Sequence, residues 1–160
     1  RTRPVLDASG YSHRVVESDV FDTHDYEQDP EKFAEHYQNL YNNKAYCDLS
    51  CRNVPYRGQP FFQSEFGGIR WNPDKANELE SWGYGQAPKS LDEFYARFEG
   101  LVTVLQKHPD IFGYCYTQLT DIFTEENGIY RFDRSAKFDM EKICTIQKRV
   151  AEYEKKSTVK

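Results

Sequence analysis

The sequence predicts an α/β fold in which short parallel strands alternate with helices, in one domain that spans residues 1–160. The first observation is a set of four short apolar segments, each followed by polar residues or glycine, as buried strands are. The second is a set of three segments in which apolar residues recur three and four positions apart, as on one face of a helix. These segments largely alternate along the chain, and right-handed crossovers between them would make the strands parallel.

The first two strands are expected near the amino terminus. Residues 3–9 are short and apolar and stop at Gly10, which predicts a buried strand. Residues 19–22 predict the second strand, which leads into the polar run 23–26.

A helix is expected next, over about residues 30–42. Asp29 can cap it and Pro30 suits its first turn. Its apolar face consists of Phe33, Tyr37, Leu40 and Tyr41. Residues 44–58 are rich in Asn, Arg and Gly and are expected to form a loop.

The third strand is predicted over residues 61–65. Gly67 and Gly68 terminate it, and residues this small would let a substrate approach the backbone closely. A long connection then runs to residue 89, and only residues 74–80 in it have a helical pattern. Connections of this length are uncommon in compact domains and are usually functional.

The clearest helical pattern covers about residues 91–107. Ser90 and Glu93 make a capping box before it, and His108 with Pro109 ends it. Its apolar stripe comprises Leu91, Phe94, Tyr95, Phe98, Leu101, Val102 and Leu105.

A fourth strand over residues 111–119 and a last helix complete the pattern. Asp139 caps that helix, and residues 154–160 are charged and expected to be a frayed tail. Four such units fit either a small doubly wound sheet or one half of an eight-unit barrel, and length alone does not decide between them. The stripe of the last helix comprises Met140, Ile143, Ile146, Val150 and Tyr153.

Composition and charge argue against some classes of partner. The net charge is −5, charged residues make up 29% of the chain, and no basic cluster stands out, so neither nucleic acid nor a membrane surface is expected as a partner. No apolar stretch approaches the roughly 18 residues that a membrane span needs. Aromatic residues are frequent at 16%. Most should fill the core, and the others are candidates for stacking on sugar rings.

The cysteines point away from a metal site. Cys47 and Cys51 are four positions apart, but no second pair follows at zinc-site spacing, so we expect neither a metal nor another cofactor. Cys115 and Cys144 lie in apolar patterns, where cysteine commonly packs as a small hydrophobe. Free thiols favour a reducing compartment and therefore a cytoplasmic location.

Candidate functional residues follow the predicted strands. The carboxyl ends of parallel strands face the active site, so His24, Tyr26, Glu65 and Tyr116 should meet in one bowl. Glycoside hydrolysis with retention uses two carboxyl groups about 5–5.5 Å apart, one of which attacks the anomeric carbon. Glu65 is a candidate for that nucleophile, with the other three as hydrogen-bond donors that keep it ionised. From position alone, a salt bridge or a capping contact is the more common role of such a carboxylate.

The run Gly-Gln-Pro-Phe-Phe-Gln-Ser-Glu-Phe-Gly-Gly-Ile, residues 58–69, resembles the nucleophile segment of glycoside hydrolase family 2, which includes β-galactosidases and β-glucuronidases. The segment 64–68 alone is weak, but the series of matching runs covers most of the chain in the family's order. The further runs are residues 81–85, 94–101, 112–121, 127–130 and 132–134.

The resemblance implies that the chain is the carboxyl-terminal half of a (β/α)8 TIM barrel, with strands five to eight. Glu65 then matches the nucleophile at the end of the seventh strand, and His24 and Tyr26 match the end of the sixth. Trp82, in the matching run 81–85, is a further candidate for substrate binding. Tyr116, also a candidate sugar contact, departs from the Trp that many relatives carry beneath the sugar.

The family's general acid/base belongs to an Asn-Glu pair that ends the fourth strand, upstream of residue 1. Asn77 and Glu78 form such a pair here, but they lie in the connection after Glu65 and not at a strand end, so they are not expected to take that role.

The resemblance therefore implies a parent protein that hydrolyses β-glycosidic bonds in oligosaccharides or glycosides with retention and is β-galactosidase-like. This chain would carry the nucleophile, lack the acid/base and be inactive alone. The alternative is a carbohydrate-binding or scaffold fragment without turnover. Expected partners are a carbohydrate substrate, the missing half of the barrel and a second copy of the chain.

Overall fold

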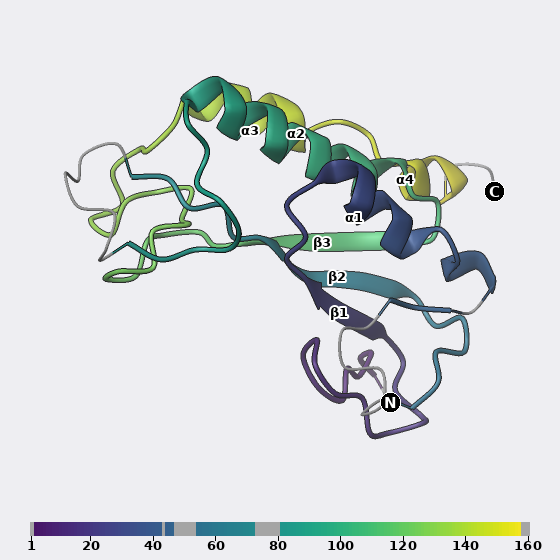
Figure 1. Ribbon diagram of the computed structural model, residues 1–160. Helices are drawn as coiled ribbons and strands as arrows, with labels where there is room; N and C mark the ends of the chain where they lie inside the picture. The colour runs from purple at the N-terminus through teal and green to yellow at the C-terminus, as the bar shows by residue number, and fades with distance from the viewer. Residues whose placement is uncertain (1, 43, 47–53, 73–80, 158–160) are drawn as a thin grey trace.

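The computed structural model describes residues 2–42, 44–46, 54–72 and 81–157 (Figure 1). In these residues, three strands form a parallel sheet in the order β1-β2-β3. Their bounds are Phe21–Asp25 for β1, Phe61–Gly67 for β2 and Ile111–Thr117 for β3. The expected α/β class with a parallel sheet is confirmed, and three of the four expected strands are present.

The predicted strand over residues 3–9 is wrong, because this segment folds on its own neighbours instead of joining the sheet. The Asp19 backbone N–H donates to the Val5 carbonyl at 2.8 Å, and the Asp19 carboxylate accepts from the Val5 N–H at 2.9 Å. The Asp7 carboxylate accepts from the backbone N–H groups of Arg14 and Val15. The Asp19 carboxylate therefore takes a donor that a strand ladder would use, and the Asp7 carboxylate ties the segment to residues 14 and 15.

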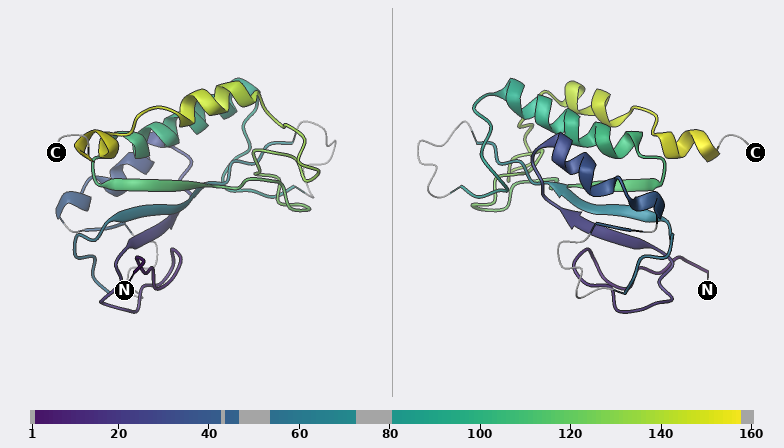
Figure 2. Two further views of the ribbon diagram at one scale, coloured as in Figure 1. Left: turned by 180° about the vertical axis from the view of Figure 1, so that it is seen from behind. Right: turned by 45° about the vertical axis from the view of Figure 1, so that its right-hand side comes forward.

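The helices all lie on one face of the sheet (Figures 1 and 2). The longest is α2, Leu91–Lys107, and Ser90 caps it by accepting from the Glu93 N–H at 3.2 Å. This helix and its Ser90 cap are confirmed as predicted, while the Glu93 carboxylate accepts from the Lys89 N–H at 2.8 Å and not from the Ser90 N–H that a capping box would use. The others are α1 Pro30–Tyr37, the short 3₁₀ helix η1 Leu40–Asn42, α3 Met140–Gln147 and α4 Glu152–Ser157.

Two predicted helices are interrupted. The helix expected over 30–42 ends at Tyr37 and continues as η1, although Asp29 caps its start as expected. The last helix divides into α3 and α4, because the Glu154 carboxylate accepts from the Ala151 N–H at 2.8 Å and begins a new helix there. Residues 154–157, expected to fray, belong to α4, while 158–160 lie outside the described residues.

The hydrophobic core lies between the sheet and the helices. Its largest members are aromatic side chains that are fully buried: Tyr37 and Phe33 of α1, Phe61 and Phe66 of β2, and Phe94 and Phe98 of α2. Burying rings of this size is the dominant stabilising contribution to such a fold. None of the helices in the described residues is both long and apolar enough to cross a membrane.

The opposite face of the sheet carries no helix in the described part of the chain (Figure 2). Phe62 of β2 and Phe112 of β3 stack there with ring centroids 5.5 Å apart, and Phe112 is 41% exposed. Cys115 lies exposed, so its predicted burial is wrong, while Cys144 is half-buried. We name the side that carries Phe62, Phe112 and Cys115 the open face.

His13 joins the amino-terminal segment to β1. Its Nδ1 lies 2.7 Å from a carboxylate oxygen of Asp7, and its Nε2 lies 2.8 Å from the Asp22 carbonyl and 3.1 Å from the Asp22 carboxylate. Burial opposes protonation of His13, but its hydrogen bonds with Asp22 and Asp7 prevail and raise its pKa to about 9. A protonated imidazole therefore clamps the segment at neutral pH.

We expect the free energy of unfolding to fall as the pH rises from about 6.5 towards 9. A histidine whose pKa is raised by folding stabilises fully below its unfolded-state pKa, and that contribution disappears above its folded-state pKa. The loss should be on the order of 1–3 kcal/mol in urea unfolding of the chain. The variant His13→Gln should abolish this slope, whereas His108→Gln should keep it; an unchanged slope in His13→Gln would contradict the assignment.

Candidate active site

The candidate site lies at the carboxyl ends of the three strands, where Glu65 of β2 is paired in register with His24 of β1. Irregular segments follow at this end: residues 68–72 and 81–90 after β2, and residues 118–139 after β3 (Figure 1). Parallel α/β folds place their ligands outside the carboxyl ends of the strands. The position of Glu65 therefore agrees with the expectation from the sequence.

A β-bulge in β2 decides where the Glu65 side chain lies. On the β1 side, Thr23 pairs with Gln63 and His24 pairs with Glu65, so Ser64 is an extra residue. On the β3 side, Gln63 pairs with Tyr114 and Phe66 pairs with Tyr116. Three steps along β2 therefore match two steps along β3, which again leaves one extra residue in β2. Strict alternation would turn Glu65 towards the helices with Gln63. The bulge gives that place to the fully buried Phe66 and leaves the Glu65 side chain 39% exposed.

Two side chains from the end of β1 meet the same oxygen of Glu65. The Tyr26 hydroxyl donates to Oε2 of Glu65, and Nδ1 of His24 lies 3.2 Å from that oxygen. The Tyr26 hydroxyl also lies 3.3 Å from Oγ1 of Thr117, at the end of β3. Burial, and after it the hydrogen bond with Glu65, raises the pKa of Tyr26, so its hydroxyl keeps its proton and remains a donor.

An aromatic wall leads away from Glu65. The ring of Tyr84 stacks on Tyr26 with centroids 3.4 Å apart and planes 6° apart. Trp82 packs edge-on against Tyr84 at 5.0 Å and is 48% exposed, so a face of its indole is accessible. Sequence reasoning found Trp82 but missed Tyr84, although Tyr84 lies in the same matching run and is flanked by two glycines.

Tyr116 lies apart from this group. Its ring packs against Phe66 at 5.6 Å and Phe98 of α2 at 5.2 Å, and its hydroxyl accepts from the Ile69 N–H at 3.2 Å. These contacts turn it towards the helices. Thr117, the next residue of β3, contacts the Tyr26 hydroxyl beside Glu65 instead. Of the predicted residues, the structure brings Glu65, His24 and Tyr26 together. Trp82 is connected to them through its contact with Tyr84, and Tyr116 lies apart.

The glycines after Glu65 make room for the protein's own rings. Gly67 has φ +83°, and a Cβ there would lie 2.3 Å from the Tyr116 ring. Gly68 has φ +59°, and its Cβ would lie 2.4 Å from the Tyr84 ring. Both positions combine a left-handed backbone with a filled neighbouring space. The expected room for a substrate beside this backbone is therefore taken by aromatic side chains.

A buried ion pair supports the loop that borders the wall. Nζ of Lys137 lies 2.7 and 3.0 Å from the carboxylate oxygens of Asp121 and 2.9 Å from the Glu126 carbonyl. Burial lowers the pKa of Lys137, and the Asp121 carboxylate opposes that effect. Glu126 in turn exchanges backbone hydrogen bonds with Trp71 and Trp82. The ion pair thus helps to fix the backbone that carries Trp82.

A cavity of about 490 Å³ adjoins His24 and Tyr26, the two residues that contact Glu65. It lies between the residues after β1 and the turn at 84–85, and it belongs to the same site because it shares His24 and Tyr26 with it. Its other aromatic members are Tyr11, His36, Tyr46 and Tyr84.

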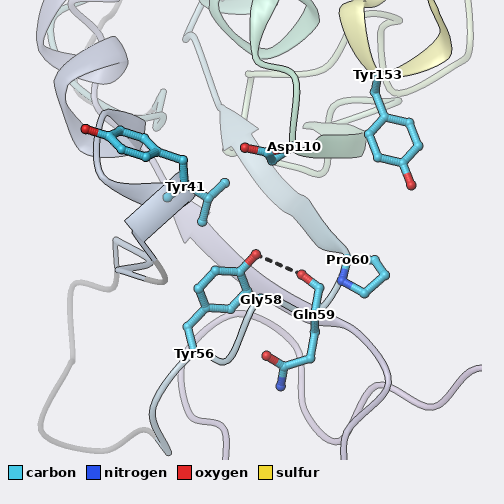
Figure 3. Close-up of a pocket in the computed structure, with 8 residues that line it drawn as sticks. Tyr41, Tyr56, Gly58, Gln59, Pro60, Asp110 and Tyr153 are labelled. Atoms are coloured by element: carbon cyan, nitrogen blue, oxygen red, sulfur yellow. Dashed lines mark hydrogen bonds between the residues drawn. The ribbon is translucent and has the colours of Figure 1, made fainter. Parts of the chain in front are cut away.

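A second hollow of about 430 Å³ lies at the opposite, amino-terminal end of β2 and β3 (Figure 3). Tyr41, Asp110 and Tyr153 surround it, and the Tyr56 hydroxyl donates to the Gln59 carbonyl at 2.8 Å beside it. Five residues of strand, about 16 Å, separate Pro60 from Glu65, so this hollow is not part of the candidate site.

The described residues contain no group of three His, Cys, Asp or Glu side chains that could hold a metal ion. Cys47, Cys51, Asn77 and Glu78, and the helical pattern at 74–80, lie outside the described residues.

Solved structures of β-glucuronidases resemble the fold of this chain. The chain is similar to a Bacteroides uniformis β-glucuronidase, with a TM-score of 0.50 and 16% identity over 74% of this chain. It is also similar to a Bifidobacterium dentium β-glucuronidase complexed with coumarin-3-O-glucuronide, with a TM-score of 0.54 and 12% identity over 85% of this chain. The chain spans only 14% and 22% of those enzymes, respectively. No protein-family model and no curated protein sequence matches the chain. At these identities the likeness shows the fold alone.

We expect Gly67→Ala to lower the free energy of unfolding by about 1–3 kcal/mol, because alanine is strained at this φ and its Cβ would strike the Tyr116 ring. Urea unfolding followed by circular dichroism measures the loss. Gly113→Ala in β3 is the matched control: its Cβ would lie 3.1 Å from Phe62, a half-buried ring that can shift, so the loss should be smaller. Equal losses in the two variants would contradict this account of Gly67.

Proposed function

We propose that this chain belongs to a retaining β-glycosidase of the glycoside hydrolase family 2 type, and that Glu65 is its nucleophile. The observation that carries the proposal is the bulge that turns Glu65 out of the core, at the end of the middle strand, onto the Tyr26 hydroxyl and beside His24. A nucleophilic carboxylate must stay ionised, and hydrogen-bond donors favour its ionised form. The β-glucuronidase-like fold supports the same family.

The aromatic wall fits a carbohydrate substrate. A pyranose has an apolar C–H face, and Trp82, which packs against Tyr84, offers a half-exposed indole on which a sugar could stack. We propose β-glycosides as the substrate class, with the galactoside suggested by the sequence and the glucuronide suggested by the structural likeness as the first candidates.

The second carboxyl is proposed to come from another part of a parent protein. Retention requires a general acid/base about 5–5.5 Å from the nucleophile. In the described residues, the recorded polar contacts of the Glu65 side chain are with Tyr26 and His24, and neither is a carboxyl. By the family resemblance, this acid would end the fourth strand of a complete barrel.

The half-barrel is part of the same proposal. A sheet with helices on one face and exposed Phe112 and Cys115 on the other is what a segment of a (β/α)8 barrel would present to its interior. We propose that β1, β2 and β3 take the places of strands six, seven and eight. Residues 3–9 would then hold the fifth place, without strand pairing in this structure.

The alternative is a carbohydrate-binding fragment without turnover. The stack of Trp82, Tyr84 and Tyr26 favours it, because a sugar platform needs no carboxylate. The two proposals differ in what they require of Glu65. Covalent chemistry needs its oxygen as a nucleophile, whereas binding through the wall tolerates its replacement by glutamine.

We expect 2-deoxy-2-fluoro-β-glycosides to label Glu65 in a longer protein that contains this chain and the acid/base. The fluorine slows hydrolysis of the glycosyl-enzyme, so the labelled peptide can be identified by mass spectrometry. Galactosyl, glucuronyl and mannosyl reagents should be compared to find the sugar. Glu65→Gln should abolish labelling, while Glu125→Gln, a change in the neighbouring loop, should retain it.

Labelling at another carboxylate would overturn the nucleophile assignment. Sugar binding without any label would favour the binding-only alternative. The 160-residue chain alone should turn over an unactivated β-glycoside negligibly, since a missing acid removes roughly 10²–10⁴-fold of rate. Robust turnover by the chain alone would refute the missing-acid proposal.

We expect the isolated chain to self-associate or to be poorly soluble, because the exposed ring of Phe112 on the open face and the edge strands β1 and β3 of the sheet in the described residues favour association. Size-exclusion chromatography with light scattering measures the mass. Phe112→Lys should shift the distribution towards monomer, whereas Tyr41→Lys, an exposed ring remote from that face, should leave it unchanged. A soluble monomer for the unmodified chain would contradict this expectation.

A further inference from the structure

The amino-terminal segment holds His24 from the side opposite Glu65. Oγ of Ser9 lies 3.1 Å from Nε2 of His24, and the Tyr11 ring packs edge-on against the imidazole at 4.6 Å and 70°. Gly10 lies so close that a Cβ there would be 1.8 Å from the His24 ring. The Gly10 N–H donates to the Asp22 carboxylate at 3.0 Å, which fixes this backbone on β1. His24 is 8% exposed as a result.

The two ring nitrogens of His24 therefore face different groups. Nδ1 lies 3.2 Å from Oε2 of Glu65, and Nε2 faces the Ser9 hydroxyl. A neutral imidazole carries one proton, and the nitrogen that holds it donates while the other accepts. A bare Nδ1 lone pair at this distance from a carboxylate oxygen would be repelled. A hydroxyl can either donate or accept, so Ser9 is able to match the tautomer that Glu65 requires.

We infer that Ser9 is a positioning residue that holds neutral His24 in its Nδ1–H tautomer, with its O–H donated to Nε2, so that the imidazole places a proton and not a lone pair beside Glu65. Free histidine favours the Nε2–H form, so this arrangement has to be imposed by the partner of Nε2. Oε2 of Glu65 then accepts a hydrogen bond from Tyr26 and has the Nδ1 proton of His24 beside it, at 3.2 Å between nitrogen and oxygen but outside hydrogen-bond geometry. Both favour the ionised carboxylate.

The importance of this arrangement for catalysis rests on the proposed function, but the tautomer itself does not. If Glu65 is the nucleophile, Ser9 acts on it through His24 and never touches the substrate. Replacing Ser9 would then lower the rate of labelling at Glu65, while the identity of the labelled residue would stay the same.

The tautomer can be read directly by long-range ¹H–¹⁵N spectroscopy of the imidazole rings in the ¹⁵N-labelled chain, without any substrate. For the neutral His24 ring, we expect Nδ1 to give the chemical shift of a protonated nitrogen and Nε2 that of an unprotonated one. In Ser9→Ala, the ¹⁵N chemical shifts of Nδ1 and Nε2 should become more similar, as in a mixture of tautomers, or should exchange, as in the opposite tautomer. Ser9→Thr keeps the hydroxyl and should preserve the original pattern.

Tyr11→Phe is the matched control, because it keeps the ring that packs on His24 and should leave the tautomer unchanged. Well-dispersed amide spectra identify variants that fold. Should Ser9→Ala fail that test, Ser9→Cys retains a side chain of similar size with a weak donor and should show the same change in part. An Nε2–H tautomer in the unmodified chain, or an unchanged pattern in the folded Ser9→Ala or Ser9→Cys variant, overturns the inference.

A second measurement separates this inference from the proposed function. In the longer protein, Ser9→Ala should slow labelling of Glu65 by roughly tenfold, because a lone pair in place of the Nδ1 proton would destabilise the neighbouring carboxylate, and Ser9→Thr should restore the rate. A shifted tautomer without any labelling of the unmodified protein would reject the glycosidase and keep the role of Ser9. Normal labelling of Glu65 together with an unchanged tautomer in Ser9→Ala would reject the role of Ser9 and keep the glycosidase proposal.

Discussion

The extra residue in β2 is the constraint on which the rest of the site depends. Phe61 and Gln63 point towards the helices, and both are fully buried. Without the bulge at Ser64, the two-residue period would send the Glu65 carboxylate into the same apolar layer, where an ionised group without a partner is costly. With it, Phe66 completes the core and Glu65 reaches the open side of the sheet. One inserted residue thus satisfies the packing of the domain and the chemistry of the site together.

The surroundings of Glu65 are fixed from both neighbouring strands and from two loops. Tyr26 supplies a protonated hydroxyl from the end of β1, and its ring is backed by Tyr84. That stack is possible because Gly68 has no side chain to occupy the same space. The loop after β3 is held by the ion pair of Lys137 with Asp121, and the backbone bonds of this loop set the position of Trp82. Rigid support of this kind is what a preorganised site needs.

The sequence predicted those parts of the fold that depend on local signals. The capping box and apolar stripe located α2, and an apolar run closed by glycines located β2 and its terminal Glu65. The failures have non-local causes. Residues 3–9 have a strand's composition, but the Asp19 carboxylate binds the Val5 N–H, and the Asp7 carboxylate binds the backbone of Arg14 and Val15 instead. The orientation of Tyr116 and the exposure of Cys115 depend on which face of β3 each occupies and on what covers that face, and neither can be read from alternation alone.

Gly10 shows how a residue without a functional group can be as constrained as a reactive one. Its φ of +70° and the His24 ring beside it exclude every side chain, so any replacement would push the imidazole towards Glu65 or lift the segment from β1. If Glu65 reacts as proposed, a mutational scan read by activity would find positions 10 and 65 both intolerant, position 10 for a steric reason alone. Intolerance to substitution therefore marks two kinds of position in such a site, the reacting groups and the backbone that confines them. Only the chemistry of the side chain distinguishes one kind from the other.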